Sequence, residues 1–106
     1  MSPRKLGYAT VSILGALRAG TRYGLDIMAR TDLPSGTVYP TLGRLEARGF
    51  VKGAWESAAL AERESRPRRR YYSLTPAGAR ALADALHEFR SLTDPSAATG
   101  SLPQES

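Results

Sequence analysis

The sequence lacks cysteine, and this absence excludes several kinds of chemistry at once. Without a thiol there is no disulfide, no zinc–thiolate site and no sulfur nucleophile. Histidine is nearly absent too, and His87 by itself builds neither a catalytic triad nor a metal site. No carboxylate pairing suggests acid–base catalysis, and no glycine motif suggests a phosphate-binding loop. We therefore expect a protein that is not an enzyme and that holds no metal and no cofactor.

Long apolar runs are also missing. A membrane-spanning helix needs about 18 or more consecutive apolar residues, and no segment of this chain approaches that length. The stretch after the basic start keeps Thr10, Ser12 and Arg18, which makes it too polar for a secretory signal. We expect a cytoplasmic protein without a membrane partner.

Positive charge is what the sequence has in excess. Its 106 residues include 15 Lys and Arg against 10 Asp and Glu, which gives a net charge of +5 at pH 7 and an isoelectric point near 10.1. The length fits one domain with a modest core. A basic balance favours a polyanionic partner, but many basic proteins never bind nucleic acid. The position of the charges therefore matters more than their sum.

Apolar side chains at helical spacing predict three helices in the first half of the chain. The expected ranges are residues 8–18, 23–30 and 35–48. Gly20 and Gly49 are expected to end the first and third of these helices. We expect Ser35 or Thr37 to cap the third helix, and Pro40 lies close enough to its start to be tolerated.

Two strands and a last helix follow. The strands are expected over residues 50–56 and 70–75. Residues 57–69 between them are small, charged and turn-prone, so we expect a hairpin with a long basic loop. Thr75 suits the N-cap of the last helix and Pro76 its first position. From Asp94 onward the chain is rich in Pro, Ser, Ala and Gly, which favours disorder.

The order helix, helix, helix, strand, strand, helix predicts a winged helix-turn-helix. This fold is mainly α with a small β-hairpin, which is the wing. The prediction divides the chain into a winged-helix DNA-binding domain over residues 1–75, a C-terminal dimerisation helix over residues 76–93 and a disordered tail over residues 94–106.

The motifs of these segments carry a family resemblance. They are, in chain order, Gly24-Leu-Asp-Ile27, Ser35-Gly-Thr-Val-Tyr-Pro-Thr-Leu42, Arg44-Leu-Glu46, Gly49-Phe-Val51, Trp55 and Arg66-Pro-Arg-Arg-Arg-Tyr-Tyr-Ser-Leu-Thr-Pro-Ala-Gly78. The sequence from Thr10 to Leu86 resembles the PadR-type transcriptional regulators. The resemblance implies a homodimeric winged-helix repressor of the short type, with a single C-terminal dimerisation helix. Leu25 departs from the family, which often has an aromatic residue there.

The third helix is the expected recognition helix, because its N-terminal end combines small polar residues with an aromatic one. A helix that enters the major groove in this way brings backbone amides and the positive end of its dipole close to phosphate. Tyr39 and Arg44 are suited to base edges or phosphates. The expected DNA-binding residues of this helix are Ser35, Gly36, Thr37, Tyr39, Pro40 and Arg44. The alternative is that Ser35 and Thr37 only cap the helix while Tyr39 packs on a neighbour.

The wing adds a cluster of arginines. Those expected to bind DNA are Arg66, Arg68, Arg69 and Arg70. Because side chains alternate along a strand, Arg68 and Arg70 should face opposite to Arg69, so only part of the cluster touches DNA at once. Arginines at a hairpin tip suit phosphate contact and insertion into a narrow minor groove. The alternative is a solvated basic loop that Glu62 and Glu64 partly neutralise.

Trp55 also has two interpretations. A tryptophan in the first wing strand is typical of a hairpin anchor, which would pack against Tyr71 or Tyr72 across the sheet. Some relatives of the family bind flat aromatic compounds between subunits, so a role in effector binding is the second interpretation. We favour the anchor and leave a small-molecule effector open.

The last helix carries an apolar seam that covers either the domain's own core or a second subunit. We favour a second subunit, whose first helix would meet the far end of the seam. The expected dimerisation residues are Tyr8, Val11, Leu14, Leu82, Leu86 and Phe89.

Together these features favour a sequence-specific DNA-binding transcriptional regulator. We expect a dimeric repressor that binds a pseudo-palindromic operator in double-stranded DNA. Whether a small-molecule inducer relieves repression stays open. The alternative function is a winged-helix adaptor that makes protein–protein contacts without specific DNA binding, and it predicts little dependence on salt.

Overall fold

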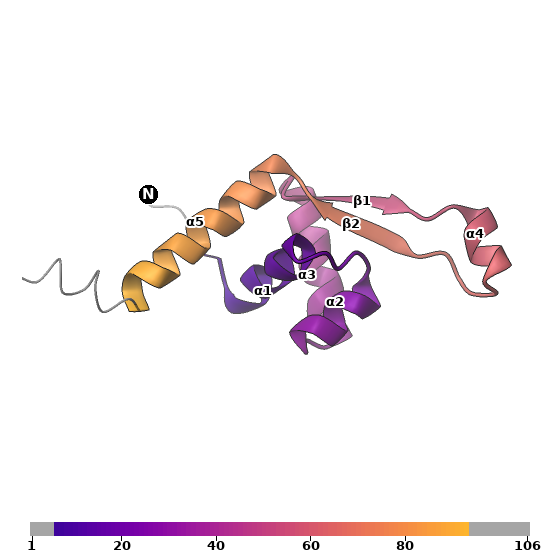
Figure 1. Cartoon of the computed structure of the whole chain (residues 1–106), viewed down its shortest axis with the longest axis horizontal. Helices are drawn as coiled ribbons and strands as arrows, with labels where there is room; N and C mark the ends of the chain where they lie inside the picture. The colour runs from indigo at the N-terminus through magenta and orange to yellow at the C-terminus, as the bar shows by residue number, and fades with distance from the viewer. Residues whose placement is uncertain (1–5, 94–106) are drawn as a thin grey trace, which may run out of the picture.

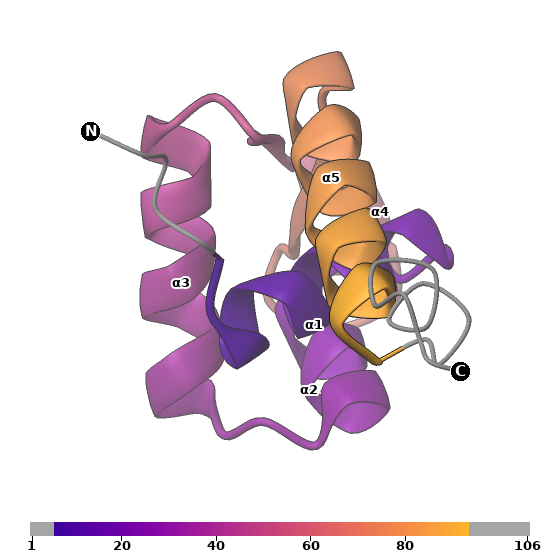
Figure 2. The same cartoon turned by 90° about the vertical axis from the view of Figure 1, so that its left-hand side faces the viewer.

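The computed structural model describes residues 6–93 of the chain. The elements in chain order are α1 (Tyr8–Arg18), α2 (Gly24–Thr31), α3 (Ser35–Ala47), β1 (Val51–Trp55), α4 (Ala58–Arg63), β2 (Arg70–Leu74) and α5 (Pro76–Thr93). In Figure 1, α1, α2 and α3 cluster at the centre, the hairpin extends to one side and α5 to the other. Figure 2 shows α3 on one side of the molecule and α5 on the other, with α1 between them.

The winged helix-turn-helix predicted from the sequence is confirmed. α1 and α5 have their predicted bounds. α3 and β2 each end one residue earlier than predicted, and α2 and β1 differ from the predictions by one residue at each end. β1 and β2 pair antiparallel, with Gly53 opposite Tyr72 and Trp55 opposite Arg70. The expected disordered tail over residues 94–106 lies outside the described residues.

The prediction of an irregular wing loop was wrong in one respect, because the loop contains the short helix α4. Ser57 caps this helix, and its side-chain oxygen accepts a hydrogen bond from the Leu60 backbone N–H at 3.1 Å. Ala61 is buried. The run of alanine and leucine favours a helix, but the six residues of α4 are too few to show a clear amphipathic period. Ser65 then turns the chain back, with a left-handed φ of 54°.

The two helix caps predicted from the sequence have opposite outcomes. Thr75 is the N-cap of α5 as expected, since its Oγ1 accepts a hydrogen bond from the Gly78 N–H at 3.0 Å. The predicted cap of α3 by Ser35 or Thr37 is wrong, because Pro34 occupies the N-cap position and no side chain caps this helix. Ser35 is instead the first helical residue. The first turn of α3 is therefore exposed without a side-chain cap over its amides.

The core lies where α1, α2 and α3 meet the hairpin and the first half of α5. Its fully buried side chains include Ile13, Leu14, Ile27, Val38, Leu42, Leu45 and Leu82. The start of α5 approaches the chain after α3 so closely that a Cβ on Gly78 would overlap the Phe50 carbonyl oxygen. Thr75 Oγ1 also donates a hydrogen bond to the Gly49 carbonyl at 2.6 Å. These contacts fix the angle at which α5 leaves the domain.

Leu14 and Leu82, both expected at a dimer contact, belong to this core and have no exposed surface. They therefore cannot contact a second subunit, which corrects their expected place at the dimer surface. The second half of α5 extends past the core and exposes Leu92. Across residues 6–93, no helix has the length and apolar character needed to cross a membrane.

Candidate nucleic-acid interface

One face of α3 is buried and the opposite face is open. Val38, Thr41, Leu42 and Leu45 pack into the core, and the residues expected to bind DNA lie on the other side. Of that set, Ser35, Gly36, Tyr39, Pro40 and Arg44 are exposed and Thr37 is half-buried. Arg44 donates a hydrogen bond to Thr41 Oγ1 at 3.1 Å, which orients its guanidinium along the helix.

Tyr39 packs on a neighbouring helix, as the alternative interpretation expected, and also stays partly exposed. Its ring lies over Gly24 at the start of α2, so closely that a Cβ on Gly24 would overlap the ring and its hydroxyl. Tyr39 nevertheless keeps 46% of its surface exposed. The absence of a side chain at Gly24 thus lets the ring pack against α2, while the rest of the ring stays exposed.

Glu56 organises the wing, and sequence reasoning missed it. Its carboxylate is buried and receives two hydrogen bonds from the Arg66 guanidinium, at 2.7 and 2.8 Å. The Arg69 backbone N–H and the Tyr71 hydroxyl each donate a further bond at 3.1 Å. These donors, Arg66 first, hold the pKa of Glu56 at about 2 against the opposing effect of burial.

Arg66 therefore links the two sides of the wing loop through ion pairs, a structural role that the sequence did not indicate. Its guanidinium is held by Glu56 and, at 3.1 Å, by Glu64. The two carboxylates, Glu56 above all, raise the pKa of Arg66. Because two carboxylates already engage this guanidinium, it has fewer donors left for a phosphate than Arg68 or Arg69.

Arg70 connects the wing to α3. Its Nη2 lies 2.7 Å from Glu46 Oε2, and its guanidinium stands beside the rings of Trp55 and Tyr72, at 5.4 and 5.8 Å from their centroids. The Glu46 carboxylate compensates most of the Arg70 charge. Through this ion pair Arg70 ties the start of β2 to the end of α3.

Arg68 and Arg69 are the wing arginines whose charge is not compensated. Within residues 6–93, neither has a carboxylate at ion-pair distance. Arg68 Nε donates to the Glu56 carbonyl at 2.9 Å and its guanidinium lies 5.6 Å from the Trp55 centroid. Arg69 lies 4.2 Å from the Tyr23 centroid. Arg68 and Arg70 thus lie near the Trp55 ring, and Arg69 lies near the Tyr23 ring.

The expectation that Trp55 anchors the hairpin was wrong. The strand register places it opposite Arg70, and Tyr71 instead packs edge-on against Tyr23 with 5.7 Å between ring centroids. Trp55 keeps 57% of its surface exposed. It lies at the loop end of the hairpin and is not part of the core cluster.

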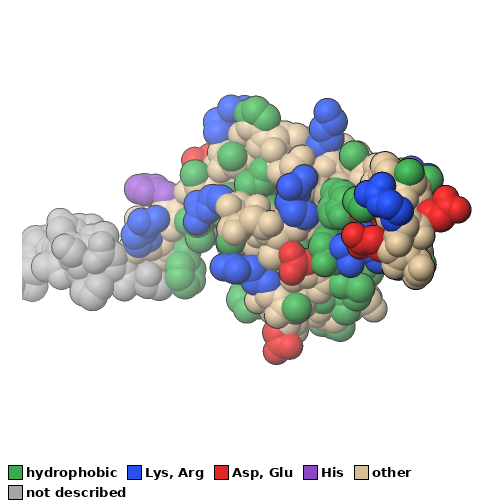
Figure 3. Space-filling model, turned by 45° about the vertical axis from the view of Figure 1, so that its right-hand side comes forward, with side chains coloured by type: hydrophobic (Ala, Val, Ile, Leu, Met, Phe, Trp, Pro, Cys, Tyr) green, Lys and Arg blue, Asp and Glu red, His purple; other side chains and the backbone are tan. Residues whose placement is uncertain are grey.

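The hairpin and the helices enclose a concavity of about 400 Å³. We call it the wing concavity. α2 and α3 contribute Leu25 and Tyr39 to its wall, and the wing contributes Trp55 and all four arginines, Arg66, Arg68, Arg69 and Arg70. Figure 3, in which the side of the molecule with the wing is turned forward, shows Lys and Arg side chains spread over this face, with apolar and some acidic side chains among them. Residues predicted from two distant parts of the sequence therefore line one surface.

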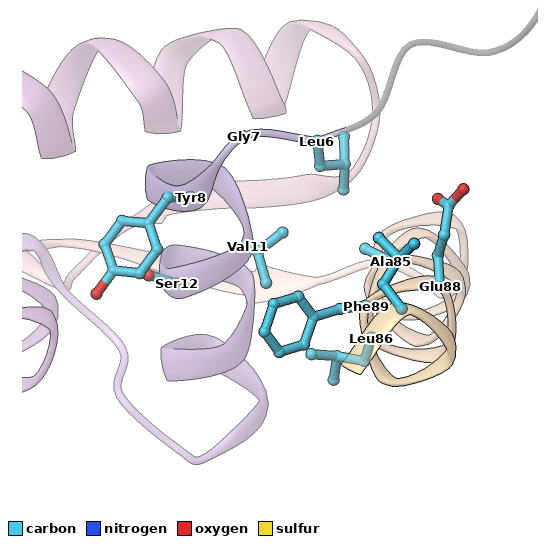
Figure 4. Close-up of a pocket in the computed structure, with 10 residues that line it drawn as sticks. Leu6, Gly7, Tyr8, Val11, Ser12, Ala85, Leu86, Glu88 and Phe89 are labelled. Atoms are coloured by element: carbon cyan, nitrogen blue, oxygen red, sulfur yellow. The ribbon is translucent and has the colours of Figure 1, made fainter. Parts of the chain in front are cut away.

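A second concavity, of about 410 Å³, separates α1 from the end of α5. We call it the α1–α5 groove, and four of the expected dimerisation residues line it: Tyr8, Val11, Leu86 and Phe89. Figure 4 shows Val11 on α1 and Phe89 on α5 pointing toward one another across it. Tyr8 is 78% and Phe89 64% exposed. No group of His, Asp or Glu side chains in residues 6–93 is placed to hold a metal ion.

Comparison with known proteins agrees with this geometry. Residues 13–84 match the model of the "Transcriptional regulator PadR-like family". No curated protein sequence matches the chain. Among solved structures, a PadR family transcription regulator from Clostridium difficile is 25% identical, with a TM-score of 0.69 over 90% of this chain and 97% of that one.

Two further solved structures are similar. Bacillus subtilis PadR, solved in complex with operator DNA, is 25% identical with a TM-score of 0.64, over 74% of this chain and 46% of that one. Bordetella bronchiseptica BpsR, whose DNA binding is regulated by 6-hydroxynicotinic acid, is 26% identical with a TM-score of 0.66, over 97% of this chain and 73% of that one. Since the family model covers well over half of its residues, the chain belongs to the PadR-like family of transcriptional regulators.

Proposed function

We propose that this regulator binds double-stranded DNA sequence-specifically, as a homodimer that represses transcription from a pseudo-palindromic operator. The observation that carries the proposal is the wing concavity, in which Tyr39 of the recognition helix and the uncompensated arginines Arg68 and Arg69 line one surface. An exposed helix face and unpaired arginines are what a polyanionic duplex needs. The operator complex of Bacillus subtilis PadR supports DNA as the ligand.

The recognition helix α3 and the wing arginines would make different kinds of contact with DNA. The open N-terminal half of α3 presents uncapped amides and Tyr39, which suit a helix that enters the major groove. Arg44 follows further along the helix and is the candidate for a base edge. Arg68 and Arg69 reach phosphates and add affinity that does not depend on sequence.

The α1–α5 groove is the proposed dimer surface. Its lining is mostly apolar, and Leu92 at the end of α5 is 71% exposed. Such an apolar surface gains free energy when a second copy covers it. A two-fold dimer formed through α5 would present two recognition helices to successive turns of the duplex.

Control by a small molecule is a further part of the proposal. BpsR supports it, because that relative responds to 6-hydroxynicotinic acid. A ligand that binds one dimer arrangement better than another changes the distance between recognition helices and thereby the affinity for DNA.

A mobility shift with an unrelated 30-base-pair duplex at low and moderate salt tests the DNA-binding claim. We expect the duplex to be shifted, and the affinity to fall by about a hundredfold or more between 50 and 200 mM salt, because counterions are released from the phosphates on binding. An absent shift at both salt concentrations would contradict the proposal and favour an adaptor that binds proteins.

A further inference from the structure

The exposed Trp55 has no structural role that the fold explains. It stands outside the core cluster and faces Arg70 across the hairpin ladder. An indole is the largest apolar surface a side chain offers, and its exposure beside a ligand-facing cavity points to contact with that ligand. Trp55 lines the wing concavity on the wing side, opposite Tyr39.

Two arginines are held over the ring of this indole. The guanidinium groups of Arg68 and Arg70 lie 5.6 and 5.4 Å from the ring centroid, and Glu56 and Glu46 fix them there. Arg68 uses its Nε for the Glu56 carbonyl, which leaves its two terminal nitrogens for a ligand. A guanidinium in this position offers the paired donors that a phosphate accepts.

Gly53 is a second observation in favour of this arrangement. It lies in the middle of β1, where a glycine weakens a strand. A Cβ at this position would come within 2.7 Å of the Arg70 Nη2 and crowd the whole guanidinium. The glycine thus makes room for Arg70 to lie across the strand beside Trp55. A glycine in β1 therefore leaves the space that the Arg70 guanidinium occupies over the Trp55 ring.

We propose that Trp55 is a DNA contact, and that the wing concavity holds the sugar–phosphate backbone of one DNA strand. When α3 lies in the major groove, the hairpin that projects beside it lies against the neighbouring sugar–phosphate backbone. The DNA strand whose backbone separates the two grooves then passes between α3 and the wing. A backbone alternates apolar deoxyribose with charged phosphate, which matches an indole beside an arginine. The inference rests on the proposed function.

Trp55 is the only tryptophan of the sequence, so its fluorescence reports on this site alone. The probe is a 30-base-pair duplex, either selected for binding or unrelated in sequence. With either duplex at saturation, we expect the Trp55 emission to change and its quenching by acrylamide to fall at least twofold. The selected and the unrelated duplex should act alike, because backbone contacts carry no sequence information.

Two substitutions complete the test. Trp55→Ala should weaken both duplexes by about tenfold, the scale of one cation–π-supported contact. Trp55→Phe keeps a flat apolar ring, so its affinity for both duplexes should fall by about threefold or less. Circular dichroism and thermal melts check that both variants fold like the parent.

The outcomes separate the two proposals. If the parent binds neither duplex in the mobility shift, both the proposed function and this inference fail. If the parent binds DNA while the Trp55 emission and acrylamide quenching stay unchanged, the inference is overturned and the proposed function stands. A loss in Trp55→Ala that is confined to the selected duplex also overturns it, because that result would mean base readout.

Discussion

The wing arginines allow a prediction whose size follows from the structure. Of the four arginines between residues 66 and 70, Arg66 and Arg70 are compensated by carboxylates, and Arg68 and Arg69 are not. The change to test is therefore the double substitution Arg68→Gln and Arg69→Gln. It removes two uncompensated charges from each subunit and leaves in place the hydrogen bonds that Arg66 donates to Glu56.

The expected effect is a smaller dependence of affinity on salt. Each phosphate contact contributes about 0.9 to the slope of log affinity against log salt, so four arginines in a dimer contribute about 3.6. Between 50 and 200 mM salt, the parent should therefore lose about two decades more affinity than the double variant. At low salt the variant should bind selected and unrelated duplexes more weakly to a similar degree.

The measurement is a fluorescence-anisotropy titration of a labelled duplex at four salt concentrations. Arg80→Gln is the matched control, since Arg80 is an exposed arginine on α5, away from the wing. The control should keep the parental slope. A double variant with the same slope as the parent would refute the assignment of Arg68 and Arg69 to phosphates.

Three further predictions follow from the same geometry. Phe89→Asp puts a charge into the α1–α5 groove and should shift the chain to monomers in sedimentation velocity. Ala83→Asp, at an exposed position of the same helix outside the groove, should leave the sedimentation profile unchanged. A dimeric Phe89→Asp would contradict the proposed surface. Gly78→Ala should lower the free energy of unfolding by about 1–3 kcal/mol in urea titrations, because its Cβ meets the Phe50 carbonyl, while Gly43→Ala, which meets nothing, should be neutral or stabilising. Glu56 has a folded pKa of about 2, below its ordinary 4.5, so it contributes stability above pH 4.5 that is lost as the pH falls toward 2. Melting temperatures of the parent should show this acid loss, and Glu56→Gln should be less stable at pH 7 and lack that part of the pH dependence.

The helices and strands were predictable because their signals are local. Apolar spacing defined α1 and α3, and Thr75 with Pro76 marked the start of α5. The short helix α4 was not predictable in this way, since six residues give too little periodicity. The cap of α3 failed for a related reason, because Pro34 stands one residue before the serine that suggested a cap.

The site was predictable only in part, because its contacts join residues far apart in the sequence. Arginine spacing indicated a basic wing but did not show that Glu56 holds Arg66 or that Glu46 holds Arg70. Those pairings depend on the hairpin register. In the same way, the apolar seam of α5 was visible, but its division into a core part at Leu82 and an exposed part at Phe89 depends on where α1 packs.

Selection of bound sequences from a random duplex pool tests the central claim most directly, that two recognition helices and two wings bind one operator. The account predicts enrichment of a pseudo-palindrome whose half-sites are centred about 10 base pairs apart, one helical turn. Enrichment of a single asymmetric half-site would contradict the dimeric part of the account. A pool that stays random after repeated rounds would contradict sequence-specific DNA binding itself.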